Sequence, residues 1–128
     1  MNTTEIGNEL KDLDKVGMDR LVEIAEETGH FLSNEKLKMN QIRRFLDGVR
    51  RIESELKGRT GFQHVQDAII LLRPKLAYAA GRERKIKPLM EVLDPAIKSG
   101  AKSEENFHKL LRLIEGIVAY HRFHGGLN

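Results

Sequence analysis

The sequence predicts an all-α fold, a compact bundle of five to six helices. Apolar residues recur at three- and four-residue steps through most of the 128-residue chain, as they do on one face of an amphipathic helix. No segment shows the strict alternation or the run of β-branched residues that is typical of a strand. A chain of this length buries roughly 65 to 70% of the surface that its unfolded form exposes, which is enough for one core. We therefore expect an acidic arm with a short helix over residues 1–35, part of the domain or docked on it, and a basic helical-bundle domain over residues 36–128.

The sequence of the arm, residues 1–35, predicts two short helices. Four apolar residues before Gly17 are spaced for one weak helix that Gly7 interrupts, so this stretch is either frayed or a separate docking arm. Asp19 is placed to cap a second helix, and Gly29 is placed to end it.

Residues 36–87 predict two longer helices. Asn40 is a good cap for the first, which ends near Gly58. Its apolar stripe consists of Ile42, Phe45, Leu46, Val49, Ile52 and Leu56. The second begins at Phe62 and stops at Gly81, and it should kink or restart at Pro74, which lacks a backbone donor and restricts the residue before it.

The C-terminal third predicts two more helices after a basic connector. Pro88 suits the first position of one helix, Pro95 should disturb it, and Gly100 should end it. Ser103, which two glutamates follow, is a capping residue for the last helix, which runs down to the Gly-Gly pair near the C-terminus.

Charge is unevenly distributed along the chain, although the net charge is only +3. Residues 1–35 contain three basic and nine acidic residues, residues 36–87 contain fourteen and five, and residues 88–128 contain five of each. A basic middle segment beside an acidic arm is typical of a chain that meets a polyanion with one surface. The alternative is a basic face that is merely solvated.

Residue types exclude several kinds of chemistry. The chain has no cysteine, and its Gly58–Gly61 segment lacks the Walker spacing and its Lys-Ser/Thr end. Its four serines lie in no nucleophile elbow. His121 and His124 lie one helical turn apart, and we expect core packing for the first and a helix-end role for the second rather than a metal site. We therefore expect no enzyme activity, no metal and no cofactor.

Hydropathy indicates a cytoplasmic protein. No apolar run approaches the roughly 18 residues that a membrane span needs. The first 15 residues have neither the basic start nor the apolar stretch of a signal peptide.

Basic side chains are the candidates for function. Arginine holds phosphate oxygens bidentately and lysine supplies a mobile charge. Candidate nucleic-acid contacts are Arg43, Arg44, Arg50, Arg51, Arg73, Lys75, Arg82, Arg84 and Lys85. Tyr78, flanked by alanines, either stacks on a base at the surface or fills the core. With few other aromatic residues outside core spacing, the chain is expected to contact phosphates without reading sequence.

Five motifs carry a resemblance to a known family. They are NQIRRF at residues 40–45, LRPKLAYAAGR ending at Arg82, KPL at 87–89, PAI at 95–97 and IVAYHRFHGG at 117–126. Together they resemble the small helical subunit (Csm2 family) of type III-A CRISPR-Cas effector (Csm) complexes. The similarity covers residues 36–126, and the arm before residue 36 is not expected to contribute.

The resemblance implies a non-catalytic RNA-binding subunit in antiviral defence. Such a subunit repeats along the inner filament of a ribonucleoprotein, beside guide RNA and target RNA, with the Cas10 large subunit and the backbone subunits as partners. Base pairing between guide and target would then select the sequence. The family's basic contacts would fall on Arg43, Arg44, Arg73, Lys75 and Arg82, whereas Leu46 stands where family members often have an aromatic residue.

We also expect copies of the chain to associate head to tail. A subunit that repeats needs two complementary patches, and the acidic arm could meet the basic segment. The alternative is a helical protein-protein adaptor with a basic docking face. A steep dependence of RNA affinity on salt would favour the RNA-binding hypothesis over the adaptor.

Overall fold

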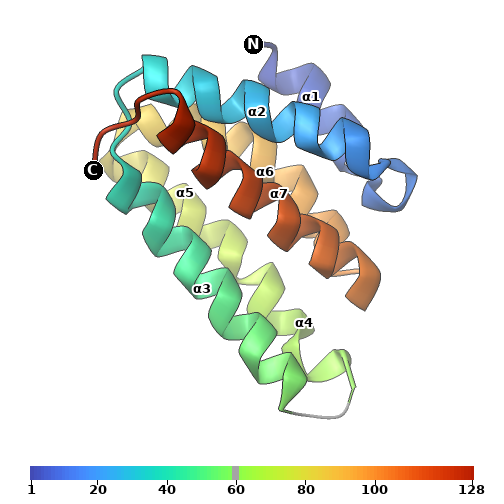
Figure 1. Cartoon of the computed structure of the whole chain (residues 1–128). Coiled ribbons are helices and arrows are strands. Elements are labelled where there is room, and N and C mark those ends of the chain that lie inside the picture. Colours follow the sequence, from blue (N-terminus) through green and yellow to red (C-terminus); the bar gives the residue numbers. More distant parts are fainter. Residues whose placement is uncertain (59–60) are drawn as a thin grey trace.

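The computed structural model describes residues 1–58 and 61–128, and these residues form an all-α bundle (Figure 1). Its α-helices are α1 (Thr3–Leu10), α2 (Met18–Asn34), α3 (Met39–Lys57), α4 (Gln63–Ile70), α5 (Leu72–Arg82), α6 (Lys87–Gly100) and α7 (Glu104–Phe123). Two 3₁₀ turns, η1 (Leu13–Lys15) and η2 (Arg84–Ile86), join α1 to α2 and α5 to α6. Only Leu71 separates α4 from α5, so these two act as one interrupted helix. The predicted all-α bundle is confirmed. Arg59, one of the fourteen basic residues, and Thr60, both within the Gly58–Gly61 segment, lie outside the described residues.

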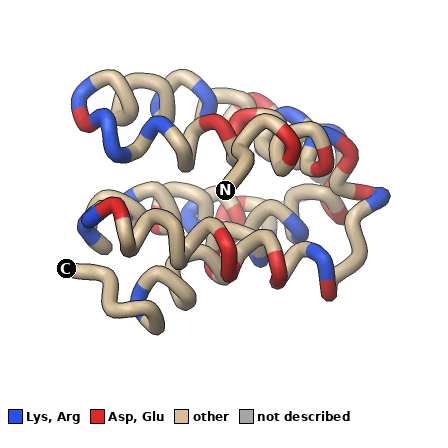
Figure 2. Tube along the Cα trace, turned by 90° about the horizontal axis from the view of Figure 1, so that it is seen from above, with Lys and Arg blue, Asp and Glu red and all other residues tan. Residues whose placement is uncertain are grey.

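The helices form two layers (Figures 1 and 2). In one layer α7 lies between α2 and α3, and in the other α6 lies between α1 and α5. Contacts between α6 and α7 join the layers at the centre, and α4 packs against α3. At the outer edge, α3 and α5 are therefore neighbours that belong to different layers.

A single apolar core runs through the bundle and includes residues of the N-terminal segment. Ile6 and Leu10 of α1 and Leu13 of η1 are buried in the same cluster as Phe107 of α7. The Lys109 ammonium donates hydrogen bonds to the Leu13 and Val16 carbonyl oxygens at 2.9 and 2.8 Å. These contacts attach η1 and the residue that follows it to α7.

Of two glycines in the N-terminal segment, Gly7 is predicted to interrupt a helix and Gly29 to end one, but neither does so. Helix α1 continues through Gly7, and α2 continues past Gly29 to Asn34, so both predictions are wrong. A Cβ at Gly29 would lie 2.7 Å from the Ile117 carbonyl oxygen and the His121 nitrogen on α7. Gly29 therefore permits the close crossing of α2 and α7 instead of ending a helix.

Two predicted N-caps are also wrong. Helix α2 begins after Gly17, and Asp19 lies within its first turn. Helix α3 begins after Lys38, so Asn40 lies inside the helix. The Met39 N–H donates to the Leu127 carbonyl oxygen, so the C-terminal tail satisfies a donor at the start of α3.

Prolines and the last cap behave closer to expectation. The restart predicted at Pro74 occurs at Leu71, because Pro74 sits in the first turn of α5, where a missing N–H removes no helical hydrogen bond. Pro88 likewise lies in the first turn of α6, and Pro95 lies inside that helix, which ends at Gly100 as predicted. The Ser103 hydroxyl accepts a hydrogen bond from the Asn106 N–H at 3.1 Å, which confirms the predicted cap of α7.

Among the described residues, no helix combines the length and the apolar character that crossing a bilayer requires.

Candidate nucleic-acid interface

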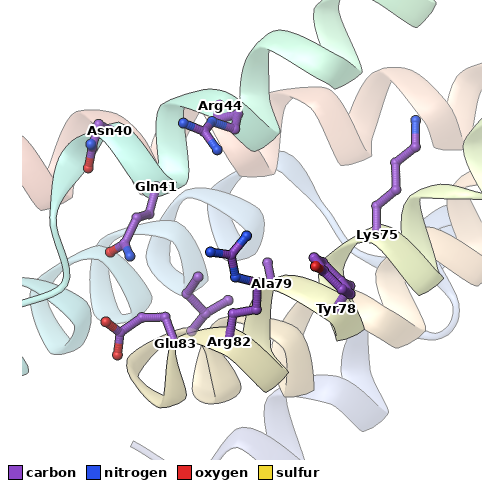
Figure 3. Close-up of a pocket in the computed structure, with 9 residues that line it drawn as sticks. Asn40, Gln41, Arg44, Lys75, Tyr78, Ala79, Arg82 and Glu83 are labelled. Atoms are coloured by element: carbon purple, nitrogen blue, oxygen red, sulfur yellow. The ribbon is translucent and has the colours of Figure 1, made fainter.

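A groove of about 510 Å³ lies between α3 and α5 (Figure 3). Three of its lining side chains are cations: Arg44 from α3, and Lys75 and Arg82 from α5. The remaining lining residues are Asn40, Gln41, Tyr78, Ala79, Glu83 and Ile86. We call this space the basic groove, because three cations but only one carboxylate, that of Glu83, are among its lining residues.

The buried stripes of the two helices determine which side chains face the groove. Ile42 and Leu46 of α3 are buried, which leaves Arg44 on the exposed side. On α5, Leu72, Leu76 and Ala80 are buried, which leaves residues 75, 78 and 82 exposed. Their spacing of three and then four residues places them on one face of the helix. Figure 3 shows these side chains along α5, opposite Asn40, Gln41 and Arg44 of α3.

The sequence allowed Tyr78 to lie either at the surface or in the core. The structure places it at the surface of the groove. Its side chain is 68% exposed, so it does not fill the core. The Arg82 guanidinium carbon lies 5.9 Å from the centre of the Tyr78 ring, within the range of a cation–π contact. An exposed ring beside a guanidinium plane is a surface on which a nucleobase stacks.

Glu83 has a structural role at one end of the groove. Its Oε1 accepts a hydrogen bond from the Lys85 backbone N–H at 3.1 Å and so caps η2. Arg84 and Lys85 line a separate hollow of about 300 Å³ with Glu35 and Pro88. Figure 2 shows Lys and Arg clustered at the left-hand end of the molecule, where in Figure 1 α5 ends and α3 begins.

Arg73 faces α6 and takes no part in lining the groove. Its Nε and Nη2 donate to the two carboxylate oxygens of Asp94 at 2.8 and 3.1 Å. These hydrogen bonds raise the pKa of Arg73 above its usual value. The charge of Arg73 is thus shared with a carboxylate within the protein.

The other predicted arginines divide into two kinds. Arg50 forms an ion pair with Glu115 of α7 at 3.2 Å. Arg43 and Arg51 are exposed on α3 but are not among the residues that line the groove. The structure therefore brings together Arg44, Lys75, Tyr78 and Arg82, and it places the other six predicted residues elsewhere.

Sequence reasoning missed Asn40 and Gln41 as lining residues. Both belong to the NQIRRF motif and precede Arg44 by four and three residues, which is the spacing of one helix face. That spacing would have indicated them once α3 was extended to begin at Met39.

His121 and His124 are placed as the sequence predicted. His121 is fully buried, and its Nε2 lies 2.6 Å from the Leu37 carbonyl oxygen. His124 is the C-terminal cap residue of α7, and its ring stacks on His30 with 4.0 Å between centres. Within residues 1–58 and 61–128, no three His, Cys, Asp or Glu side chains are grouped in a way that would hold a metal ion.

Comparison with known proteins gives consistent results. The family model for Csm2 of type III-A systems matches residues 15–127. A curated Streptococcus thermophilus protein described as "CRISPR system Cms protein Csm2" is 33% identical over 96 residues, covering 73% of this chain and 77% of the relative. The match begins at residue 15, so the expectation that the arm before residue 36 does not contribute to the similarity is wrong for residues 15–35. The chain belongs to the Csm2 family and is thus a small subunit of a type III-A CRISPR Csm complex.

Proposed function

We propose that this subunit binds the sugar-phosphate backbone of RNA in the basic groove, without selecting sequence. The observation that carries the proposal is that Arg44, Lys75 and Arg82 come from two helices and line one groove. In the described part of the chain, none of these three cations forms an ion pair with a carboxylate. Their charges are therefore available to phosphates that enter from solvent.

The geometry of the cations suits a polyanionic strand. Arginine presents a planar fork that grips two phosphate oxygens, and lysine adds a charge on a flexible stem. Arg82 lies seven residues after Lys75, which is about two helical turns, or roughly 10 Å, along α5. Cations spaced in this way contact successive parts of a backbone instead of one isolated anion.

The partners in this proposal are those that membership of the Csm2 family implies. The RNA strands would be the guide RNA and the target RNA, whose base pairing supplies the sequence selection that a phosphate groove lacks. The Cas10 large subunit and the backbone subunits would hold the chain in place, in the cytoplasm. The acidic residues of α2 would meet the basic segment of the next copy, which would give head-to-tail association.

We further propose that the chain has no nuclease activity of its own. The one carboxylate that lines the basic groove, Glu83, is engaged in capping η2 and is no free general base. Purified chain incubated with RNA and Mg²⁺ should leave the RNA intact. Cleavage that persists after repurification and is lost with Glu83→Gln would contradict this proposal.

Copurification tests the RNA-binding proposal. A tagged chain should bring down guide RNA and the larger Cas subunits. The variant carrying Arg44→Ala, Lys75→Ala and Arg82→Ala should still assemble with those subunits but bind target RNA at least ~10-fold more weakly, because about three phosphate contacts are lost. The matched variant carrying Lys11→Ala, Lys15→Ala and Lys98→Ala removes three exposed lysines outside the groove and should behave as wild type.

Two results would contradict the RNA-binding proposal. Wild-type affinity for target RNA in the groove variant would show that the groove does not bind RNA. Loss of the protein subunits with retained RNA binding would assign the groove to a protein partner, as in the adaptor hypothesis.

A further inference from the structure

An apolar recess of about 200 Å³ adjoins the basic groove. Its apolar lining consists of Phe45, Leu72, Leu76, Ala79, Ile86 and Leu89. Its walls share residues with the groove, among them Gln41, Arg44 and Lys75, so the two spaces adjoin along these side chains. Backbone binding alone does not explain an apolar hollow beside the cations Arg44 and Lys75.

We propose that the apolar recess holds one unstacked nucleobase of an RNA strand whose phosphates lie in the basic groove. This inference rests on the function proposed above and adds to it a site for the base. A nucleotide combines an anionic phosphate with a planar base whose faces are apolar, and one ribose separates the two. Arg44 and Lys75 line both spaces, so a phosphate held by either is next to the place where its own base would lie.

The size and the polar groups of the recess fit a single base. Its volume of about 200 Å³ is below that of pockets for drug-sized ligands, roughly 300 to 1,000 Å³, so it suits one ring system. The Gln41 amide offers both a donor and an acceptor to the edge of a base. One amide forms too few hydrogen bonds to distinguish the four bases, so we expect the recess to accept any base.

A second occupant with matching charge would be an apolar side chain on an acidic segment of a protein partner. The surroundings favour the nucleotide, because the exposed Tyr78 ring and the Arg82 guanidinium lie at the same groove. Both groups offer flat surfaces on which a neighbouring base stacks. The test below separates the two occupants.

Gly48 allows the recess to be filled while every cation remains. It lies in α3 among the residues that line the recess, and a Cβ built on it meets no other atom within 4 Å. Gly48→Leu should therefore fold and occupy the space meant for the base. Gly81→Leu is the matched control: a Cβ at Gly81 in α5 also meets nothing within 4 Å, and Gly81 does not line the groove or the recess.

The measurement compares two probes on the full-length chain at low salt. One is a single-stranded RNA of mixed sequence, and the other is the same ribose-phosphate strand with every base removed. Wild type and Gly81→Leu should bind the abasic strand about tenfold more weakly than the RNA. Gly48→Leu should lose most of this preference and keep only the part that stacking on Tyr78 contributes, and the dependence of affinity on salt should be the same in all three proteins.

Each other outcome has a definite meaning. Equal binding of both strands by wild type, with a steep salt dependence, would overturn the base site and leave the phosphate groove standing. A tenfold preference that survives Gly48→Leu would place the base elsewhere, for example on Tyr78. Absence of salt-dependent binding would overturn the proposed function itself. Copurification with tagged Gly48→Leu tests the other occupant: if the variant binds RNA as wild type does but no longer brings down the other subunits, the recess holds a protein side chain.

Discussion

Arg73 on α5 and Asp94 on α6 are joined by two parallel hydrogen bonds of 2.8 and 3.1 Å. The pair fixes the first turn of α5 against the central helix of its layer. Lys75 and Arg82 project from the same helix into the basic groove, which Arg73 does not line. Arg73 thereby stabilises the packing of α5 on α6 and is not itself a groove residue.

Arg73→Ala should lower stability and leave the RNA contacts intact. Both partners are more than a third exposed, so solvent screening limits the effect to about 1 kcal/mol. For a chain of this size that is a fall of roughly 4 °C in melting temperature. The slope of log affinity for RNA against log salt should stay at the wild-type value. A slope lowered by one unit at an unchanged melting temperature would assign Arg73 to phosphate binding instead.

Gly29→Ala should destabilise the chain far more than a helical glycine normally allows. Its Cβ would come within 2.7 Å of two backbone atoms of α7, so α2 and α7 must separate, at about 3 kcal/mol. Thermal unfolding followed by circular dichroism measures the loss. Gly48→Ala is the control, because its Cβ meets nothing within 4 Å and should stabilise by up to about 1 kcal/mol. Similar melting temperatures for the two variants would contradict the close crossing.

Glu9→Gln should lower the free energy of unfolding at neutral pH and leave it unchanged in acid. The Arg20 guanidinium donates to Glu9 at 2.6 and 2.8 Å, and these hydrogen bonds lower the pKa of Glu9 below 4.5. A lowered carboxyl pKa contributes stability that is complete above the ordinary value and is lost as pH falls through the folded-state value. Because both groups are about 40% exposed, the difference at pH 7 should be below about 1 kcal/mol.

Urea unfolding of wild type and Glu9→Gln between pH 7 and pH 2 provides the measurement. The two curves of unfolding free energy should converge below pH 4.5. A difference that stays constant across this range would show that the ion pair does not tie α1 to α2.

Local patterns in the sequence were sufficient for the helices and for one cap. The stripes from Ile42 to Leu56 and the Ser103 cap depend on residues within a few turns, so they could be read directly. Gly29 could not, because its role comes from α7, about 90 residues further along the chain. Asn40 looked like a cap for the same reason: the group that bonds to the start of α3 belongs to the C-terminal tail.

The sequence predicted that the candidate site is basic, but it did not show which of the basic residues belong to the site. Charge patterning indicated the basic segment, and Arg44, Lys75, Tyr78 and Arg82 of that segment lie in one groove. It could not show that Arg50 and Arg73 have carboxylate partners 65 and 21 residues away. The apolar recess likewise arises only where the walls of α3 and α5 meet, and no linear motif encodes that juxtaposition.

The central claim is that the basic groove holds RNA through its phosphates, and the salt dependence of binding tests it most directly. Affinity of the assembled complex for target RNA is measured at several salt concentrations for wild type, Arg44→Ala, Lys75→Ala, Arg82→Ala and the exposed control Lys98→Ala. Each groove variant should lower the slope of log affinity against log salt by roughly one unit, equally for unrelated guide-target pairs, because one phosphate contact is lost. Lys98→Ala should keep the wild-type slope. Slopes and affinities that are the same in all five complexes would contradict the claim.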